Sequence, residues 1–133
     1  MVSLEVVKTA NTALVKSQPL VAVFVSTSGI GSYALQALAS HANNGQGLRA
    51  YIVARKKAAA DKLTSECQRI CPKGQFRFVQ TDDIALLKNV DRVCAEITAA
   101  ERKEAAATGG KPKIDLLVMT QGYLAFDGRK GVV

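Results

Sequence analysis

The sequence is poor in aromatic residues, and it lacks any long apolar run. It contains four phenylalanines, three tyrosines and no tryptophan, too few rings for a platform that stacks nucleic-acid bases. No apolar stretch reaches the roughly 18 residues that a membrane-spanning helix needs. The N-terminus carries the acidic Glu5 and has no apolar signal core. We therefore expect no nucleic-acid partner, no membrane partner and no secretion.

Histidine and cysteine are scarce as well. The chain has one histidine, His41, and three cysteines, Cys67, Cys71 and Cys94. The spacing of Cys67 and Cys71 places both on one face of a helix, but a metal site would need more ligands nearby. We therefore expect no metal site, and we interpret the cysteines as buried or half-buried free thiols of a reducing cytoplasm.

Length and charge narrow the class of protein further. The chain has 133 residues, which is enough for about one domain. Its 48% hydrophobic and 22% charged residues are ordinary for a soluble globular protein and exclude a disordered tail. The net charge is +7, and the basic residues are spread along the sequence rather than clustered. Such a charge balance favours an anionic small ligand.

From residue 20 onwards, short apolar runs alternate with segments of helical periodicity. The run over 20–25 is continuously apolar, which is typical of a strand covered on both faces. We interpret residues 1–19 as an N-terminal helical extension of a domain formed by residues 20–133. The patterns predict strands over 20–25, 49–53, 75–79 and 114–119, and helices over 1–16, 30–41, 58–70 and 83–107.

Strands that alternate with helices indicate a three-layer α/β fold with a parallel sheet. Right-handed crossovers place successive strands side by side. The two most apolar strands, 20–25 and 114–119, should be neighbours at the centre of the sheet. The predicted strand order is therefore 3-2-1-4, and ligands bind such sheets beside the first strand, where the chain crosses from one half to the other.

The turn after the first predicted strand is suited to binding a phosphate. The following helix begins with free N–H groups and the positive end of its dipole. Gly29 and Gly31 would let the backbone approach a pyrophosphate, and Thr27 and Ser28 could add hydroxyl donors. The alternative is a plain helix cap whose glycines serve packing. The candidate cofactor-binding residues here are Ser26, Thr27, Ser28, Gly29, Ile30 and Gly31.

Two further candidates follow the second and third predicted strands. In dinucleotide sites an acidic residue at the end of the second strand favours a ribose 2′-hydroxyl, whereas an arginine accommodates a 2′-phosphate. Arg55 follows that strand, 24 residues after Gly31, and no acidic residue occurs at the end of the strand. The sequence therefore favours NADP(H) over NAD(H). The alternative is that Arg55 is a solvated surface charge. Asp83 could face the adenine amino group, while the alternative for Asp82 or Asp83 is a helix N-cap.

Taken together, these residues resemble the N-terminal half of a short-chain dehydrogenase/reductase. The resemblance is carried by the turn VSTSGIG, by Arg55, by the aspartate after the third strand and by the fourth strand with the Thr120–Gln121–Gly122 that follows it. The segments over 21–25, 51–53, 91–94 and 114–117 are most similar to fungal members that often belong to secondary-metabolite gene clusters. The resemblance implies a Rossmann-like fold, a nicotinamide cofactor and a small-molecule substrate that undergoes reversible carbonyl/alcohol chemistry.

The sequence departs from the family pattern at three places. The family turn reads T-G-x-x-x-G-x-G, and Ser26 stands where its first glycine would be if one residue were lost. The family's N-A-G after the fourth strand reads Thr120–Gln121–Gly122, so only Gly122 matches. The family's catalytic serine and Tyr-x-x-x-Lys pair do not occur before Val133, because Tyr33, Tyr51 and Tyr123 each lack a lysine four residues later.

We therefore expect no catalytic residue in the chain. The interpretation is an NADP(H)-dependent oxidoreductase of secondary-metabolite biosynthesis, truncated before its catalytic residues. The alternative is a non-catalytic nucleotide-binding or regulatory fragment, or a pseudogene product. The apolar strand over 114–119 would lack a neighbour at its outer edge, which favours self-association.

Overall fold

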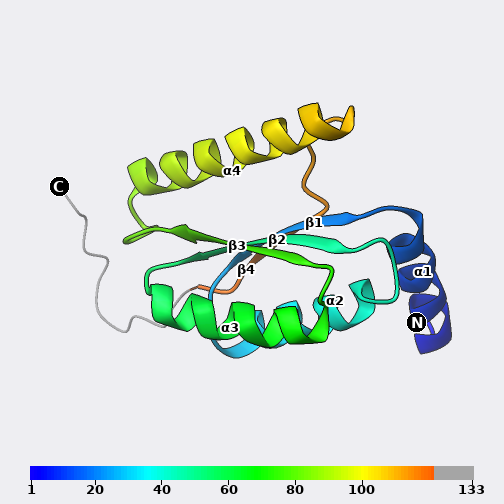
Figure 1. Ribbon diagram of the computed structural model, residues 1–133. Coiled ribbons are helices and arrows are strands. Elements are labelled where there is room, and N and C mark those ends of the chain that lie inside the picture. Colours follow the sequence, from blue (N-terminus) through cyan, green and yellow to red (C-terminus); the bar gives the residue numbers. More distant parts are fainter. Residues whose placement is uncertain (122–133) are drawn as a thin grey trace.

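A computed structural model of the protein describes residues 1–121, in which helices cover both faces of one sheet (Figure 1). The helix α4 covers one face, and α2 with α3 covers the other. This is the three-layer α/β fold that the sequence predicts. The elements are α1 (Leu4–Ser17), β1 (Leu20–Val25), α2 (Gly29–Ala42), β2 (Leu48–Ala54), α3 (Lys57–Ile70), β3 (Gln75–Gln80), α4 (Leu87–Thr108) and β4 (Leu116–Met119).

The sheet is parallel throughout, and its strand order is β3-β2-β1-β4, as predicted. Residues Leu20 to Val25 of β1 pair with Leu48 to Val53 of β2, and Ala22 of β1 pairs with Leu116 of β4. All four carboxyl ends therefore meet at one edge of the sheet. Within residues 1–121, no helix is long and apolar enough to cross a membrane.

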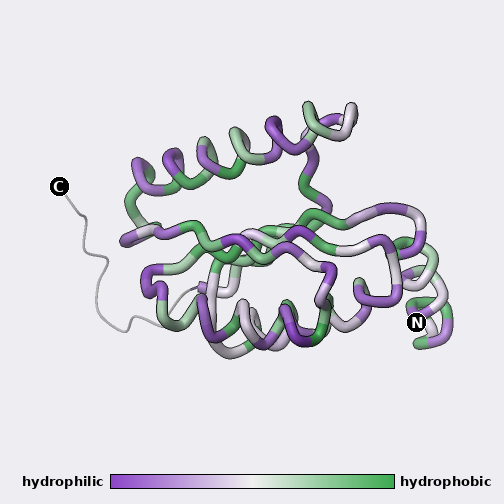
Figure 2. Tube along the Cα trace, viewed as in Figure 1, coloured by the Kyte–Doolittle hydropathy of each residue, from purple (hydrophilic) through white to green (hydrophobic). Residues whose placement is uncertain are grey.

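The strand β1 is apolar at every position because the sheet is covered on both faces there. Its residues Ala22 and Phe24 belong to the cluster beneath α2 and α3, while Val21 and Val23 belong to the cluster beneath α4. Figure 2 shows hydrophobic and hydrophilic residues alternating along α4, as expected of a helix with one side on a sheet. The continuous apolar run thus reflects two buried faces rather than one.

The strand β4 is adjacent to β1 as predicted, but it forms the edge of the described sheet rather than part of a buried centre. Leu116, Leu117 and Met119 are all exposed. The strand also begins two residues later than expected, because Asp115 makes a different connection. Its Oδ2 atom accepts the Val21 N–H at 2.8 Å, and its own N–H donates to the Val21 carbonyl at 2.8 Å.

The helix α4 begins at Leu87, later than the predicted start near Asp83. Its N-cap is Leu86, which makes no side-chain capping bond, so an N-cap by Asp82 or Asp83 is wrong. Asp83 instead closes a separate turn, in which its Oδ1 accepts the Ala85 N–H at 2.9 Å and its carbonyl accepts the Leu86 N–H at 3.2 Å. The short side chain of Asp83 therefore accepts a hydrogen bond from a nearby N–H group of the turn and does not cap the first N–H groups of α4.

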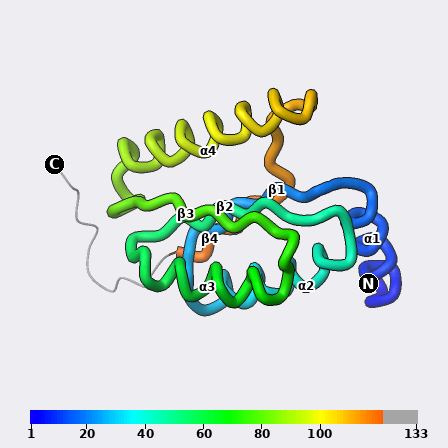
Figure 3. The backbone as a smooth tube through the Cα atoms, in the orientation of Figure 1, coloured from blue at the N-terminus to red at the C-terminus, as the bar shows by residue number. Residues whose placement is uncertain are grey.

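The N-terminal α1 lies at the end of the sheet where β1 begins, apart from the two helical layers (Figure 3). Its only buried residue is Val15. The carbonyl of Val15 accepts the Gln46 N–H at 2.8 Å, which fastens the end of α1 to the turn after α2. Apart from Val15, which belongs to the cluster beneath α2 and α3, the helix lies outside the main core, as the sequence predicts.

A polar network joins α4 to the sheet. The buried carboxylate of Glu101 accepts two hydrogen bonds from Arg49, at 2.6 and 2.8 Å, and one from the Tyr51 hydroxyl at 2.7 Å. Arg77 of β3 donates to Glu104 and lies 5.9 Å from the centre of the Tyr51 ring. Burial alone would raise the pKa of Glu101, but the hydrogen bonds from Arg49 and Tyr51 outweigh burial and lower it.

Candidate functional site

A cleft of about 830 Å³ lies at the carboxyl edge of the sheet, where ligands bind in open parallel α/β folds. Its volume falls within the range of small-molecule pockets. The cleft is bounded by the turn after β1, the end of β2, the segment after β3 and the residues that follow β4. The lining residues include Ser26, Thr27, Ser28, Arg55, Thr81, Asp82, Asp83, Thr120 and Gln121.

The structure brings five of the predicted site residues to this cleft: Ser26, Thr27 and Ser28 from the first turn, Arg55 after β2 and Asp83 after β3. Gly29, Ile30 and Gly31 form the first turn of α2 rather than the cleft wall. Gly122 lies outside the described residues.

The turn before α2 is organised by Ser26. Its Oγ atom accepts the Ser28 N–H at 3.3 Å and its hydroxyl donates to the Ser28 carbonyl at 3.3 Å. Ser28 is the N-cap of α2 but makes no side-chain capping bond, so the first N–H groups of the helix have no side-chain acceptor there. Gly29 adopts a positive φ of 61°, which an L side chain rarely does, and its missing Cβ would meet nothing within 4 Å.

Gly31 has a different role from Gly29. A Cβ at Gly31 would lie 2.8 Å from the Thr120 Oγ1 atom and 3.2 Å from the Ser26 Cβ atom. The glycine therefore lets α2 pack closely against the ends of β1 and β4. The packing alternative raised by the sequence thus describes Gly31, whereas Gly29 faces open space beside the cleft.

Thr81 is a residue of the cleft that the sequence did not single out. It is only 3% exposed, and its hydroxyl has no hydrogen-bond partner among residues 1–121. Its N–H donates to the Ala54 carbonyl at 3.0 Å, which holds it beside the end of β2. An unpaired buried hydroxyl costs about 1–3 kcal/mol. A polar ligand in the cleft would offer the missing partner, and the position of Thr81 directly after β3 is the signal that could have identified it.

The charge around the cleft is mixed. Arg55 is exposed at its rim, and Arg55 forms no ion pair within the described part of the chain. Asp82 and Asp83 line the cleft as well, from the segment after β3. Residues 1–121 hold no group of histidines, cysteines, aspartates and glutamates that could bind a metal ion. The cleft thus offers a cation, carboxylates, hydroxyls and a helix N-terminus, which together suit a ligand with phosphates and a base.

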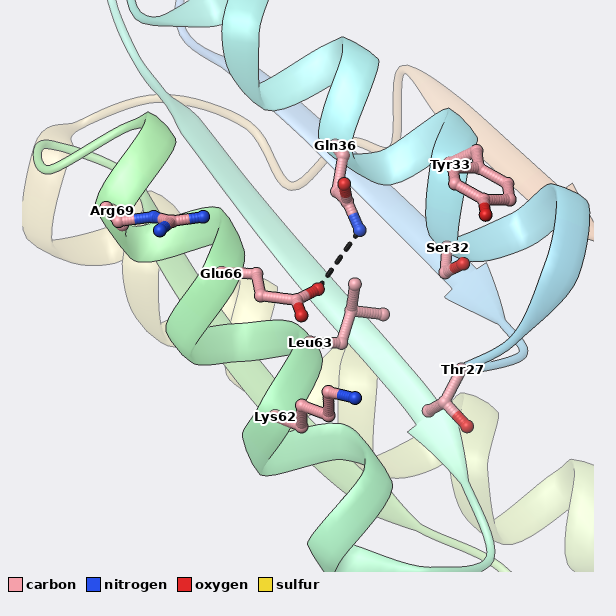
Figure 4. A pocket seen from close by; sticks show the side chains of 8 residues that line it. All are labelled: Thr27, Ser32, Tyr33, Gln36, Lys62, Leu63, Glu66 and Arg69. Carbon is pink, nitrogen blue, oxygen red and sulfur yellow. Dashed lines mark hydrogen bonds between the residues drawn. The ribbon is translucent and has the colours of Figure 1, made fainter.

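A second, smaller groove of about 420 Å³ lies between α2 and α3 (Figure 4). The Gln36 side chain of α2 donates to Glu66 of α3 at 3.1 Å and so crosses the groove. Thr27 lines this groove as well as the cleft, so the two lie next to each other at this residue. The remaining lining residues are Ser32, Tyr33, Lys62, Leu63 and Arg69.

Comparison with known proteins gives relatives that are oxidoreductases. The chain is 42% identical over 122 residues to a short-chain dehydrogenase/reductase of Stachybotrys chartarum, which covers 90% of this chain and 34% of that protein. It is 35% identical to an oxidoreductase of Emericella nidulans, covering 100% of this chain and 36% of that protein. It is also 37% identical to an NmrA-like family domain-containing oxidoreductase of an Aspergillus species, covering 98% and 36%.

These matches confirm the resemblance to fungal short-chain dehydrogenase/reductases. The chain spans about a third of the length of these relatives. Oxidoreductase relatives and a Rossmann-like sheet together imply a nucleotide cofactor. No protein-family profile matches the chain.

Proposed function

We propose that this chain provides the dinucleotide-binding part of an NADP(H)-dependent oxidoreductase of the short-chain dehydrogenase/reductase type. The whole enzyme would act on a carbonyl or alcohol intermediate of secondary metabolism. The observation that carries the proposal is the cleft at the carboxyl edge of the sheet. There the uncapped N-terminus of α2, Arg55 and Thr81 line one space of about 830 Å³, and the buried Thr81 hydroxyl has no partner among residues 1–121.

The residues present fit such a cofactor. The turn of Ser26 to Ser28 and the first N–H groups of α2 would hold the pyrophosphate, and Gly29 leaves the approach open. Arg55 would contact the 2′-phosphate, because it follows β2 and an arginine pairs well with a phosphate. Thr81 and Asp83 would face the adenine from the end of β3. When bound, the nicotinamide supplies or accepts the hydride.

The described residues contribute binding rather than proton transfer. Tyr51 is buried and its hydroxyl is bonded to Glu101 on the face under α4, so it cannot serve a substrate in the cleft. Tyr33 lies in the groove between α2 and α3. This placement favours a second candidate function, a nucleotide-binding module that has no catalysis of its own.

Three related expectations belong to the same proposal. We expect residues 1–19 to be a helical extension of the domain over 20–133, and the burial of Val15 alone in α1 supports this division. The exposed apolar side chains of β4 favour self-association through that edge. The cytoplasmic location stays a prediction.

The test measures dinucleotide binding and turnover separately in the purified 133-residue chain. NADPH and NADH are titrated by their fluorescence into wild type, Arg55→Ala and Thr81→Val. We expect wild type to prefer NADPH, and Arg55→Ala to lose about 1–3 kcal/mol of NADPH binding with little change for NADH. Turnover with carbonyl substrates separates the enzyme from the binding module. Equal affinity of wild type for both dinucleotides would contradict the NADP(H) assignment.

Thr81→Val provides the sharper control, because valine has nearly the shape of threonine. Removing an unpaired hydroxyl should leave the free chain as stable as wild type or more stable. If the hydroxyl serves the ligand, the same change should weaken NADPH and NADH equally, by about fivefold for one hydrogen bond. Unchanged binding would show that Thr81 has no part in the site.

A further inference from the structure

The groove between α2 and α3 adjoins the cleft at Thr27, the one lining residue that both share. Both helices start at the carboxyl edge of the sheet, so the Thr27 end of the groove lies near the region just beyond β2. That region also holds Arg55. A group bound beyond the end of β2 would therefore be within reach of side chains from the second turn of α3 as well as from the β2–α3 connection.

Lys62 occupies that position on α3. Lys62, Glu66 and Arg69 share one face of the helix by their spacing, and all three line the groove. The bond from Gln36 to Glu66 at 3.1 Å crosses the groove and divides the Arg69 end from the Lys62 end. Figure 4 shows the Lys62 side chain extending across the groove in the direction of Thr27. The ammonium group thus lies at the Thr27 end of the groove, the end nearest the cleft.

The charge of Lys62 is not neutralised by a neighbour. Lys57, one turn earlier, pairs with Asp61 at 2.7 Å. Lys62 forms no ion pair within residues 1–121, and the carboxylate four residues after it, that of Glu66, is held by Gln36. A cation left without a counter-ion beside a cleft attracts an anionic ligand group.

We propose that Lys62 is a second specificity-determining residue for the 2′-phosphate of NADP(H), acting from α3 while Arg55 acts from the end of β2. The inference rests on the proposed function. A 2′-phosphate is the anion that distinguishes NADP(H) from NAD(H), and a dianion is better matched by two cations than by one. Thr27, between the two cavities, adds a hydroxyl donor at the same place.

The test compares Lys62→Met with the matched control Lys57→Met. Both changes remove one charge from α3 and keep a long apolar side chain, but Lys57 pairs with Asp61 and lines neither cavity. Dissociation constants are measured for NADPH, NADH, adenosine 2′,5′-bisphosphate and ADP. We expect Lys62→Met to weaken NADPH and the bisphosphate by about 5- to 30-fold, as for a charge-assisted hydrogen bond. NADH and ADP should change less than twofold, Lys57→Met should change none of the four appreciably, and Lys62→Arg should restore most of the loss.

The outcomes separate this inference from the proposed function. If wild type prefers NADPH and Lys62→Met keeps the same preference, Lys62 has no role and only the inference is overturned. If Lys62→Met weakens NADPH and NADH equally, its effect is structural and the inference is again overturned. If wild type binds neither the dinucleotides nor the bisphosphate, the proposed function fails and the inference falls with it. Thermal unfolding of each variant verifies that the chain is folded.

Discussion

On the side of α2 and α3, the sheet presents Ala22, Phe24 and Ile52 to helices that contribute Leu35 and Leu63, and these residues form one large apolar cluster. On the side of α4, a smaller apolar cluster is continued by charged and hydroxyl groups. The alternation of β2 produces both surfaces, because neighbouring residues of a strand point to opposite faces. One strand thus joins two cores of different chemistry.

The two cores differ in chemistry because α3 and α4 bury different side chains against the sheet. The inner side of α3 carries Ala60, Leu63 and Cys67, which need only close packing. The inner side of α4 carries Val93 and Ile97 in its first half, then Glu101, for which burial is tolerable only because Arg49 and Tyr51 bind both carboxylate oxygens. The stability of the apolar face therefore depends on the close fit of its side chains. The stability of the α4 face depends on the presence of every member of its polar network.

The largest effect is expected from breaking the network. Glu101→Ala leaves the guanidinium of Arg49 and the hydroxyl of Tyr51 without their main acceptor, and the removal of one partner of a buried pair costs about 3–5 kcal/mol. The free energy of unfolding is measured in urea. The control is Glu96→Ala on the same helix, which removes a surface pair with Arg92 and should cost about 0–1 kcal/mol. Equal costs for the two variants would contradict the comparison.

A cavity on the opposite face should cost somewhat less and should behave differently. Leu35 is fully buried under the sheet, and Leu35→Ala should lower the free energy of unfolding by about 2–5 kcal/mol. Because no charge is involved, this loss should be the same at low and high salt. Leu87→Ala, at an exposed position of α4, serves as the control and should change stability by less than about 0.5 kcal/mol. A salt-dependent loss in Leu35→Ala would show that the two faces are not independent.

Acid should weaken the α4 face selectively. The hydrogen bond from Arg77 lowers the pKa of Glu104, and the hydrogen bonds from Arg49 and Tyr51 outweigh burial to lower that of Glu101. Folded-state pKa values below the unfolded ones give stability that is fully present above the ordinary glutamate pKa and is lost as pH falls through the folded pKa. We therefore expect the free energy of unfolding of wild type to fall below about pH 4. The fall should be shallower in Glu101→Gln, and parallel curves for the two proteins would argue against the network.

The smallest effect is a difference in the reactivity of the cysteine thiols on the two faces, which can be measured without changing stability. Burial raises the pKa of the Cys67 thiol to about 11 and also raises that of Cys71, and both thiols lie in the core under α2 and α3. Cys94 is exposed on α4, so the expectation that all three thiols are buried or half-buried is wrong for this residue. A disulfide reagent at pH 8 should therefore modify Cys94 rapidly and the other two only after unfolding. Rapid reaction of all three in the folded chain would show that the apolar face opens readily.

Much of this architecture could be predicted from local sequence patterns. The continuous apolar run of β1 and the spacing of the following helices indicated a parallel sheet of order 3-2-1-4, and the sheet brings Ser26, Arg55 and Asp83 to one cleft. The start of α4 could not be predicted, because Asp83 had two nearby N–H groups to bind and the choice depends on the turn geometry. The exposed outer edge of β4 follows from the predicted strand order, although the apolar sequence of this strand would suit the centre of a sheet equally well.

The sequence by itself determined the order of helices and strands and the segments that reach the carboxyl edge, because periodicity and crossover handedness act over short stretches of chain. Only the tertiary structure decided which distant side chains meet. Glu101 reaches Arg49 across 52 positions, Gly31 packs against Thr120, and the buried Thr81 hydroxyl finds no partner among residues 1–121. Such contacts depend on strand register and on the rotation of each helix against the sheet, and these are fixed only when the two faces pack together.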